Sequence, residues 1–209
     1  IKQILTFDGV PKGICEESYD SRIAVDLYDT AMDTESCAGL AAPQIGVLAR
    51  IIVVKPKAHM TLVMMNPVVE SHGRDVETQS EGCLSYPGRS REIERYRVIT
   101  VAYAYPEAPR RITHCTFKGF VARVIQHEID HLDGLCKVAG ENTRDDLFDQ
   151  AVEAVRLRGI AKVIDLQREF HINFFRANRL IEQMGDAGFL EERQGCQGRK
   201  WKNAKENIK

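Results

Sequence analysis

The spacing of apolar residues near the start of the chain predicts one amphipathic helix. Asp20 or Ser21 can cap it, because a short polar side chain accepts hydrogen bonds from the free backbone N–H groups of a first helical turn. The apolar residues that follow recur every three or four positions and so share one helix face. They are Ile23, Leu27, Ala31 and Met32. We expect the helix over about residues 21–35, ending before Cys37 and Gly39.

The middle of the chain is richer in short runs of β-branched residues, which are typical of strands, and glycine and proline punctuate these runs. We expect strands in four segments, at residues 51–54, 62–69, 98–103 and 111–117. Helical spacing of apolar residues then returns over residues 120–132, and Gly134 follows at the position where a glycine commonly ends a helix. The apolar positions of this second helix are Phe120, Val124, Ile125, Ile129 and Leu132.

The C-terminal third is helical in pattern and then becomes basic. Apolar positions recur at helical spacing from about Asp145 to Met184, with an interruption near Gly159. After Glu192 the sequence has six lysines and arginines and one acidic residue, so we expect a flexible basic tail. Strands gathered in the middle with helices at both ends favour an α+β fold over repeated βαβ units.

Composition limits the class of protein. With 44% hydrophobic and 28% charged residues, the 209-residue chain can bury a core, so disorder throughout is excluded. The 29 basic residues balance 30 acidic ones, which gives no overall field for nucleic acid, and we expect no DNA binding. No apolar stretch approaches the roughly 20 residues of a membrane-spanning helix, and no secretory signal is recognisable. Six cysteines without a CxxC pair indicate free thiols in a reducing compartment, and we expect a cytoplasmic protein.

The second helix carries a metal-binding motif, His127-Glu128-Ile129-Asp130-His131. Residues four apart share a helix face, so the two imidazoles can bind one cation while Glu128 borders an open coordination position. A catalytic metal site usually has three protein ligands and one water, so a third ligand is needed. Lys137 occupies the position of the third histidine of metzincins, which excludes that arrangement. An acidic ligand downstream, such as Glu141, Glu153 or Glu169, would make the chain a zinc endopeptidase.

Two upstream segments give a different answer. The segments are Gly39-Leu40-Ala41-Ala42-Pro43-Gln44-Ile45-Gly46 and Glu81-Gly82-Cys83-Leu84-Ser85. With the histidine motif, and in this order, they resemble the peptide deformylase family over roughly residues 20–135. Together with the element pattern, this resemblance implies small antiparallel or mixed sheets packed around a central motif-bearing helix. It divides the chain into a deformylase-like catalytic domain (1–144), a C-terminal helical extension (145–185) and a basic tail (186–209).

The resemblance also implies the metal centre. Cys83, His127 and His131 would be the ligands of one divalent ion. Thiolate and imidazole suit Fe(II) as well as zinc. Fe(II) is expected natively, and Zn(II), Ni(II) or Co(II) can replace it in a purified sample. Cys15, Cys115, Cys136 and Cys196 are interpreted as small buried hydrophobic residues instead.

The implied reaction is removal of the formyl group from N-formyl-methionine at the start of nascent polypeptides, with release of formate. Glu128 would act as general base and then general acid. The Gln44 amide and the Leu84 backbone N–H would stabilise the oxyanion. The Gly39 loop would pair with the peptide backbone, and an apolar pocket containing Val124 and Ile125 would hold the methionine side chain.

Neighbouring residues leave further hypotheses. Glu81 and Arg95 are expected to pair and brace the Cys83 segment. Asp130 and Asp133 either orient the imidazoles or lie on the surface.

One residue departs from the family pattern. Cys37 stands where the family has a glycine, so a deformylase-like binding protein with impaired turnover is a further alternative. The helical extension and basic tail suggest contact with the ribosome, where formylated chains emerge.

Overall fold

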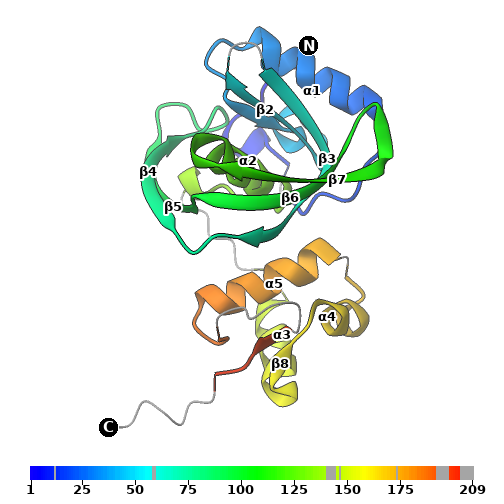
Figure 1. The fold of residues 1–209 in the computed structure, drawn as a ribbon, viewed down its shortest axis with the longest axis vertical. Helices are drawn as coiled ribbons and strands as arrows, with labels where there is room; N and C mark the ends of the chain where they lie inside the picture. The colour runs from blue at the N-terminus through cyan, green and yellow to red at the C-terminus, as the bar shows by residue number, and fades with distance from the viewer. Residues whose placement is uncertain are drawn as a thin grey trace. The chain divides into compact units, whose positions relative to one another are not determined.

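The computed structural model describes residues 1–11, 13–57, 60–139, 145, 147–172, 174–191 and 198–202. The chain forms two compact units, Ile1–Asn142 and Thr143–Lys209. Two antiparallel sheets build the first unit: a five-stranded sheet with strand order β1-β2-β3-β6-β7 and a two-stranded sheet of β4 and β5 (Figure 1). The strands are β1 (Gly39–Ala41), β2 (Ile51–Lys57), β3 (Met60–His72), β4 (Val76–Gly82), β5 (Ser90–Tyr96), β6 (Val98–Tyr105) and β7 (Ala108–Lys118).

The large sheet has a helix packed on each face. Ile51 and Val53 of β2 share a buried cluster with helix α1 (Ser21–Asp33), whereas Ile52 and Val54 share another with helix α2 (Gly119–Leu132). Successive side chains of a strand point to opposite faces, so a strand covered on both sides must be apolar at every position. This double burial is why residues 51–54 are a continuous apolar run.

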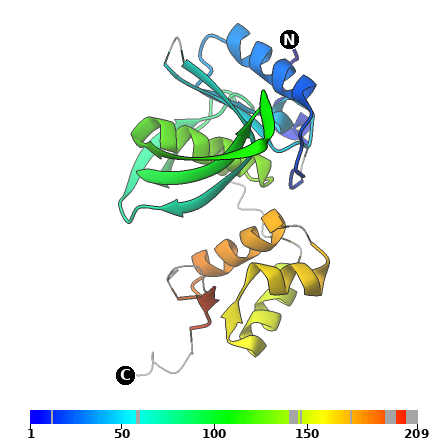
Figure 2. The ribbon, with the colours of Figure 1, turned by 45° about the vertical axis from the view of Figure 1, so that its right-hand side comes forward.

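Both helices of this unit were predicted from sequence. The Asp20 side chain caps α1 by accepting from the Arg22 backbone N–H at 2.9 Å. Helix α2 lies inside the curve that β4–β5 and β6–β7 form, a position visible in both ribbon views (Figure 1, Figure 2). The four expected strands are present and longer than predicted, whereas β1, β4 and β5 were not predicted. Three short 3-10 helices complete the unit: η1 (Phe7–Gly9), η2 (Ala42–Ile45) and η3 (Lys137–Ala139).

The chain reverses direction directly after α2. Gly134 adopts a left-handed conformation with φ +72°, and the Leu135 N–H donates back to the Asp130 carbonyl at 2.8 Å. This ending is typical of helices that stop at a glycine. The buried Arg50 donates to the Asp133 carboxylate at 2.6 Å, which ties the start of β2 to the end of α2. The turn therefore holds residues 135–139 close to the last turn of α2.

The second unit is helical with one small sheet. Helix α3 (Phe148–Arg158) ends at Gly159, where φ is +73°, in agreement with the predicted interruption. Strand β8 (Ile160–Ala161) pairs with β9 (Arg199–Lys200), and helices α4 (Val163–Phe170) and α5 (Phe174–Asp186) lie between them in the sequence. None of the described helices is both long and apolar enough to cross a bilayer.

The prediction of a flexible tail from residue 186 onward is wrong for the part that the structure describes. Strand β9 pairs with β8, and the Trp201 indole stacks on Phe189 with ring centroids 5.3 Å apart. Leu190 is buried in the core of the same unit. Three apolar residues, Phe189, Leu190 and Trp201, anchor this segment, and the composition of residues 186–209 did not reveal them. Residues 192–197 and 203–209 of the expected tail lie outside the described residues.

The turn after α2 can be tested with two glycines of similar conformation. Gly134 and Gly88 have φ of +72° and +75°, but a Cβ at 134 would lie 2.9 Å from the Gly13 carbonyl oxygen, whereas a Cβ at 88 meets no atom within 4 Å. Gly88→Ala should lower the free energy of unfolding by about 1 kcal/mol through left-handed strain alone. Gly134→Ala should cost at least about 1 kcal/mol more, because a backbone contact must also yield. Denaturant unfolding measures both, and equal losses would contradict the tight contact.

Candidate metal centre

Helix α2 places His127 and Glu128 in the lining of a cavity and His131 one turn further along the helix. His127 and His131 lie on one helix face, with ring centroids 5.1 Å apart and planes near perpendicular. Glu128 is 4% exposed and His131 5% exposed, so water reaches neither freely. Burial, followed by the nearby His127, lowers the pKa of His131 to about 3. His131 is therefore neutral at physiological pH, which is the form that binds a metal ion.

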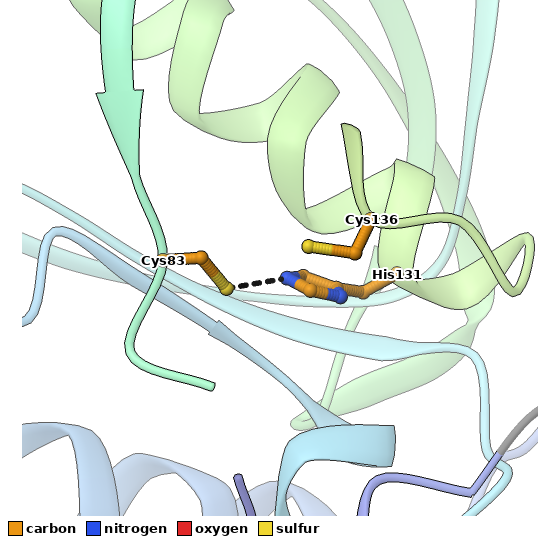
Figure 3. Close-up of side chains that lie close together, drawn as sticks. All are labelled: Cys83, His131 and Cys136. Carbon is orange, nitrogen blue, oxygen red and sulfur yellow. Dashed lines mark hydrogen bonds between the residues drawn. The ribbon is translucent and has the colours of Figure 1, made fainter. Parts of the chain in front are cut away.

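Cys83 comes from a distant part of the sequence and meets the helix as predicted. It follows directly after β4, and its Sγ lies 3.2 Å from the Nε2 atom of His131. A third donor, Cys136, lies beside them, and the ligand atoms of all three residues are within 4.8 Å of one another. Figure 3 shows the Cys83 sulfur directed at the imidazole, with the Cys136 sulfur close to both. In the sequence, Cys136 was interpreted as a small buried hydrophobic residue, because no motif marks it as a ligand.

His127 is not part of this closest group of three, but its ring is oriented for binding. Its Nδ1 atom lies 2.9 Å from Oε2 of Glu81, which accepts a hydrogen bond there and leaves Nε2 as the free nitrogen. Burial would by itself lower the pKa of His127, but the hydrogen bond to Glu81 and the charge of Glu128 raise it. Glu81 therefore fixes both the tautomer and the direction of this candidate ligand.

Glu81 is the centre of a buried charged network. The predicted pair with Arg95 is confirmed, with N–O distances of 3.0 and 2.9 Å, and Arg123 donates to the same carboxylate at 2.6 Å. Burial would raise the pKa of Glu81, but hydrogen bonds from His127 and Arg95 hold it well below its ordinary value. The carboxylate is therefore charged whenever the protein is folded under ordinary conditions.

Asp130 and Asp133 resolve the alternatives that the sequence left open. Asp130 accepts from Arg95 at 2.5 Å, and Asp133 accepts from Arg50 at 2.6 Å. Both carboxylates thus form ion pairs with arginines of the surrounding strands and loops. Their role is to hold α2 in place, and Arg95 links Asp130 to the Glu81 network.

Glu128 is buried without full hydrogen bonding. Its Oε2 atom has no hydrogen-bond partner among the described residues, and burial raises its pKa to about 7. A Cβ added to Gly39 would lie 2.5 Å from the Oε1 atom, so β1 can pass this close to the carboxylate only with a glycine at position 39. A buried, unsatisfied carboxylate beside neutral imidazole and thiols fits a site that holds a cation and a water molecule.

The Gln44 side chain is oriented by the backbone. The Ala41 N–H donates to its Oε1 atom at 2.9 Å, which turns the amide nitrogen toward Ser85 Oγ at 3.1 Å and Cys83 Sγ at 3.8 Å. Gln44 is 2% exposed. It therefore presents hydrogen-bond donors to the candidate metal centre, as the resemblance implied.

A cavity of about 420 Å³ opens beside these side chains. Of the residues expected to bind substrate, Gly39 and Val124 line it, but Ile125 does not. The prediction for Ile125 is wrong: this side chain is fully buried in the cluster between α2 and the large sheet. Adjacent helix positions point about 100° apart, and the step from Val124 to Ile125 turns the latter toward the large sheet and away from the cavity. The other lining residues include Gln44, Cys83, Leu84, Phe120, His127 and Glu128.

Cys37, the departure from the family pattern, is accommodated without strain. Its backbone is not among the residues with positive φ, so a glycine is not required there. The side chain is buried with α1 and β2, and its thiol donates to the Gly39 carbonyl at 3.2 Å. Burial raises the pKa of this thiol to about 11. Cys37 therefore supports β1 as a neutral thiol and does not line the cavity.

His127, the buried Glu128 carboxylate and the Cys83 thiol line one cavity, and His131 lies beside that thiol. This combination of donors and a carboxylate fits a metallohydrolase site. The model of the polypeptide deformylase family matches residues 12–142, and that of the FtsK gamma domain matches residues 142–201. The chain therefore belongs to the peptide deformylase family of enzymes, whose reaction removes the formyl group from protein N-termini.

Individual relatives support this. The peptide deformylase of Desulforudis audaxviator is 45% identical over 114 residues, or 54% of this chain and 72% of that protein. The peptide deformylase of Pelotomaculum thermopropionicum is 47% identical over 53% of this chain and 71% of that protein. A class I type b peptide deformylase structure from Acinetobacter baumannii matches with a TM-score of 0.60 at 26% identity, covering 66% of this chain and 97% of that one. A structure described as a probable peptide deformylase from Synechococcus phage S-SSM7 matches with a TM-score of 0.59 at 32% identity, and the match covers 66% of this chain and 99% of that one.

The raised pKa of Glu128 predicts how stability depends on pH in the metal-free protein. A carboxyl whose folded pKa of about 7 exceeds its ordinary value of 4.5 favours the folded state most below pH 4.5 and loses that contribution as the pH rises through 7. Relative to Glu128→Gln, which does not titrate there, the parent should lose up to about 3 kcal/mol between these values. Urea unfolding with a chelator present measures both proteins across this range. Parallel pH profiles would contradict the assigned burial.

Proposed function

We propose that Glu128, Gln44 and the Leu84 backbone N–H hydrolyse the N-formyl group of formyl-methionyl peptides in this chain. One observation carries the proposal. The Glu128 carboxylate is buried, lacks a partner for Oε2 among the described residues, and lies at a cavity that also contains Cys83 and His127. Such a group is costly to bury unless a ligand completes its contacts. Cys83, His127 and His131 are the proposed ligands.

The proposed cofactor is a single divalent ion, natively Fe(II), with Zn(II), Ni(II) or Co(II) able to replace it. Thiolate and neutral imidazole are donors that suit all of these ions. A bound ion of this kind lowers the pKa of water towards about 7 and polarises a carbonyl group.

In this proposal Glu128 transfers the proton. It accepts a proton from the attacking water and later delivers one to the leaving amine of the peptide. A base that must also act as an acid works best when its pKa is near the working pH, and burial raises the pKa of Glu128 to about 7.

The oxygen of the formyl group becomes negatively charged as the carbon turns tetrahedral. We assign its stabilisation to the Gln44 amide and the Leu84 N–H. Because the Ala41 N–H occupies the amide oxygen of Gln44, only the amide nitrogen can face this charge. Each donor of an oxyanion hole contributes about 2.7 to 4 kcal/mol in other enzymes.

The peptide would bind along β1. This strand is at the edge of the large sheet, so its outer backbone groups can pair with an extended peptide. Gly39 lies in that strand and lines the cavity together with Val124, Leu84 and Phe120, which offer apolar surface to the methionine side chain. Since nascent chains are the source of such peptides, we propose a cytoplasmic location.

The endopeptidase alternative has little support. It requires an acidic ligand downstream of the motif, but Glu153 and Glu169 belong to the second unit and pair with Arg156 and Arg158. Glu141 lies outside the described residues. The other alternative, a binding protein without turnover, rested on Cys37 at a glycine position of the family. Because the Cys37 backbone does not require glycine, that reason no longer holds.

Formate release tests the assignment of Glu128. Glu128→Gln keeps the size of the side chain and should lower the rate on formyl-Met-Ala-Ser at least about 100-fold while the metal content stays at the parent level. Glu92→Gln, on the exposed face of β5, is the matched control and should keep the parent rate. Unchanged formate release from Glu128→Gln would overturn the assigned role.

The second unit supports a further proposal, contact with the ribosome. Residues 143–209 contain thirteen lysines and arginines against eleven acidic residues. Several of these cations, including Arg156, Arg158, Arg176 and Arg199, form ion pairs within the unit. Lys200 and Lys202, at and after β9, are better candidates for phosphate contacts because no ion pair joins them to a described residue. The expectation of no DNA binding rests on the charge of the whole chain.

This contact can be tested without removing structure. Deleting residues 186–209 would remove β9 and Trp201, so neutralisation of two charges, Lys200→Gln with Lys202→Gln, is the better variant. It should weaken co-sedimentation with ribosomes. The slope of the logarithm of the binding constant against the logarithm of the salt concentration should fall in magnitude by about two. The matched control is Arg110→Gln with Lys118→Gln, which removes the same amount of charge from two exposed positions of β7 in the first unit. Equal effects of both pairs would contradict a specific site, and competition by duplex DNA would replace the ribosome with another partner.

A further inference from the structure

Cys136 is a thiol at the metal centre that the proposed mechanism does not use. It is 6% exposed and follows the sharp turn at Gly134, which returns the chain to the last turn of α2. Its Sγ atom, the Cys83 Sγ and a ring nitrogen of His131 all lie within 4.8 Å of one another. In Figure 3 the Cys136 sulfur faces the space where the other two donors meet.

These separations would allow the three donors to share one ion. Zinc binds sulfur at about 2.3 Å and nitrogen at about 2.0 Å, so two ligands of one tetrahedral ion lie about 3.5 to 3.8 Å apart. Cys83 Sγ and His131 Nε2 are 3.2 Å apart, so a small relaxation would admit an ion between them. The Cys136 sulfur is within 4.8 Å of both ligand atoms and lies after the turn that ends α2.

A purely structural role explains less. Cys136 packs with Tyr86, Ile93 and Val138, and an aliphatic residue could fill that place. Packing alone does not require the sulfur to approach another thiol and an imidazole. A thiol that does approach them adds a soft donor to a site that already has one.

We propose that Cys136 is a fourth protein ligand of the metal ion, so that the resting centre has two thiolates and two imidazoles. The inference rests on the proposed metal site and extends it to a residue outside the three matched motifs. Two thiolates donate more charge to the ion and bind soft, thiophilic cations more tightly. Catalysis requires an open position, so Cys136 would have to leave the ion before water binds there.

Cobalt substitution tests this directly. Co(II) bound to thiolate has a near-ultraviolet charge-transfer band whose intensity rises with the number of bound sulfurs. Protein loaded with Co(II) under anaerobic, reducing conditions should show the intensity of two thiolates. Cys136→Val and Cys83→Val should each lower it to about half, and Cys136→Val should weaken binding of Zn(II) in a chelator competition at least about tenfold.

Controls separate the possible outcomes. Cys115→Val, at a partly buried thiol of β7, should change neither the band nor the affinity. Cys136→Ser keeps the size of the side chain and replaces Cys136→Val if the latter fails to fold, as judged by circular dichroism. A one-thiolate band that survives in the Cys136 variants and disappears in Cys83→Val overturns this inference alone. A band that is absent from the parent overturns the proposed metal site as well.

Discussion

The first unit depends on a single buried carboxylate, that of Glu81. It accepts hydrogen bonds from Arg95 of β5 and from Arg123 and His127 of α2, and it lies in β4 two residues before Cys83. Two guanidinium groups and an imidazole are costly to bury unless an anion compensates them, and removing one member of such a group typically costs about 3 to 5 kcal/mol. The same contacts that offset this cost also fix the direction of His127 and the position of the Cys83 segment. Stability of the fold and geometry of the metal centre are therefore coupled through one residue.

Sequence patterns predicted the elements in which burial is regular. Apolar residues recur at helical spacing in α1 and α2, and they form short apolar runs in β2, β3, β6 and β7. Strands β4 and β5 were not predicted because their buried positions are mainly charged: Glu81 and Arg95 are inside, and the remaining residues are largely exposed and polar. No scale of hydrophobicity recognises a strand whose buried side carries an ion pair.

Within the site, residues carried by motifs were predictable and residues placed by tertiary turns were not. The meeting of Cys83 with His131 followed from the family resemblance, and the structure confirms it. Ile125 was assigned to the cavity because it lies about one turn before the metal-binding motif, but its side chain packs in the core between α2 and the large sheet. Cys136 has no motif, and only the left-handed turn at Gly134 brings it to the metal centre. In the second unit, the stacking of Trp201 on Phe189 could not be predicted, because Trp201 stands between two lysines in the sequence.

The contact between β1 and α2 has a consequence for altering substrate preference. At Gly39 the backbone touches the Glu128 carboxylate and the Val124 side chain so closely that hydrogen is the largest group that fits. Ala38, the residue before it, and Leu84 also line the cavity. A library that diversifies the cavity wall should therefore keep position 39 invariant and vary other lining residues, since the cavity and the Glu128 carboxylate share one surface there.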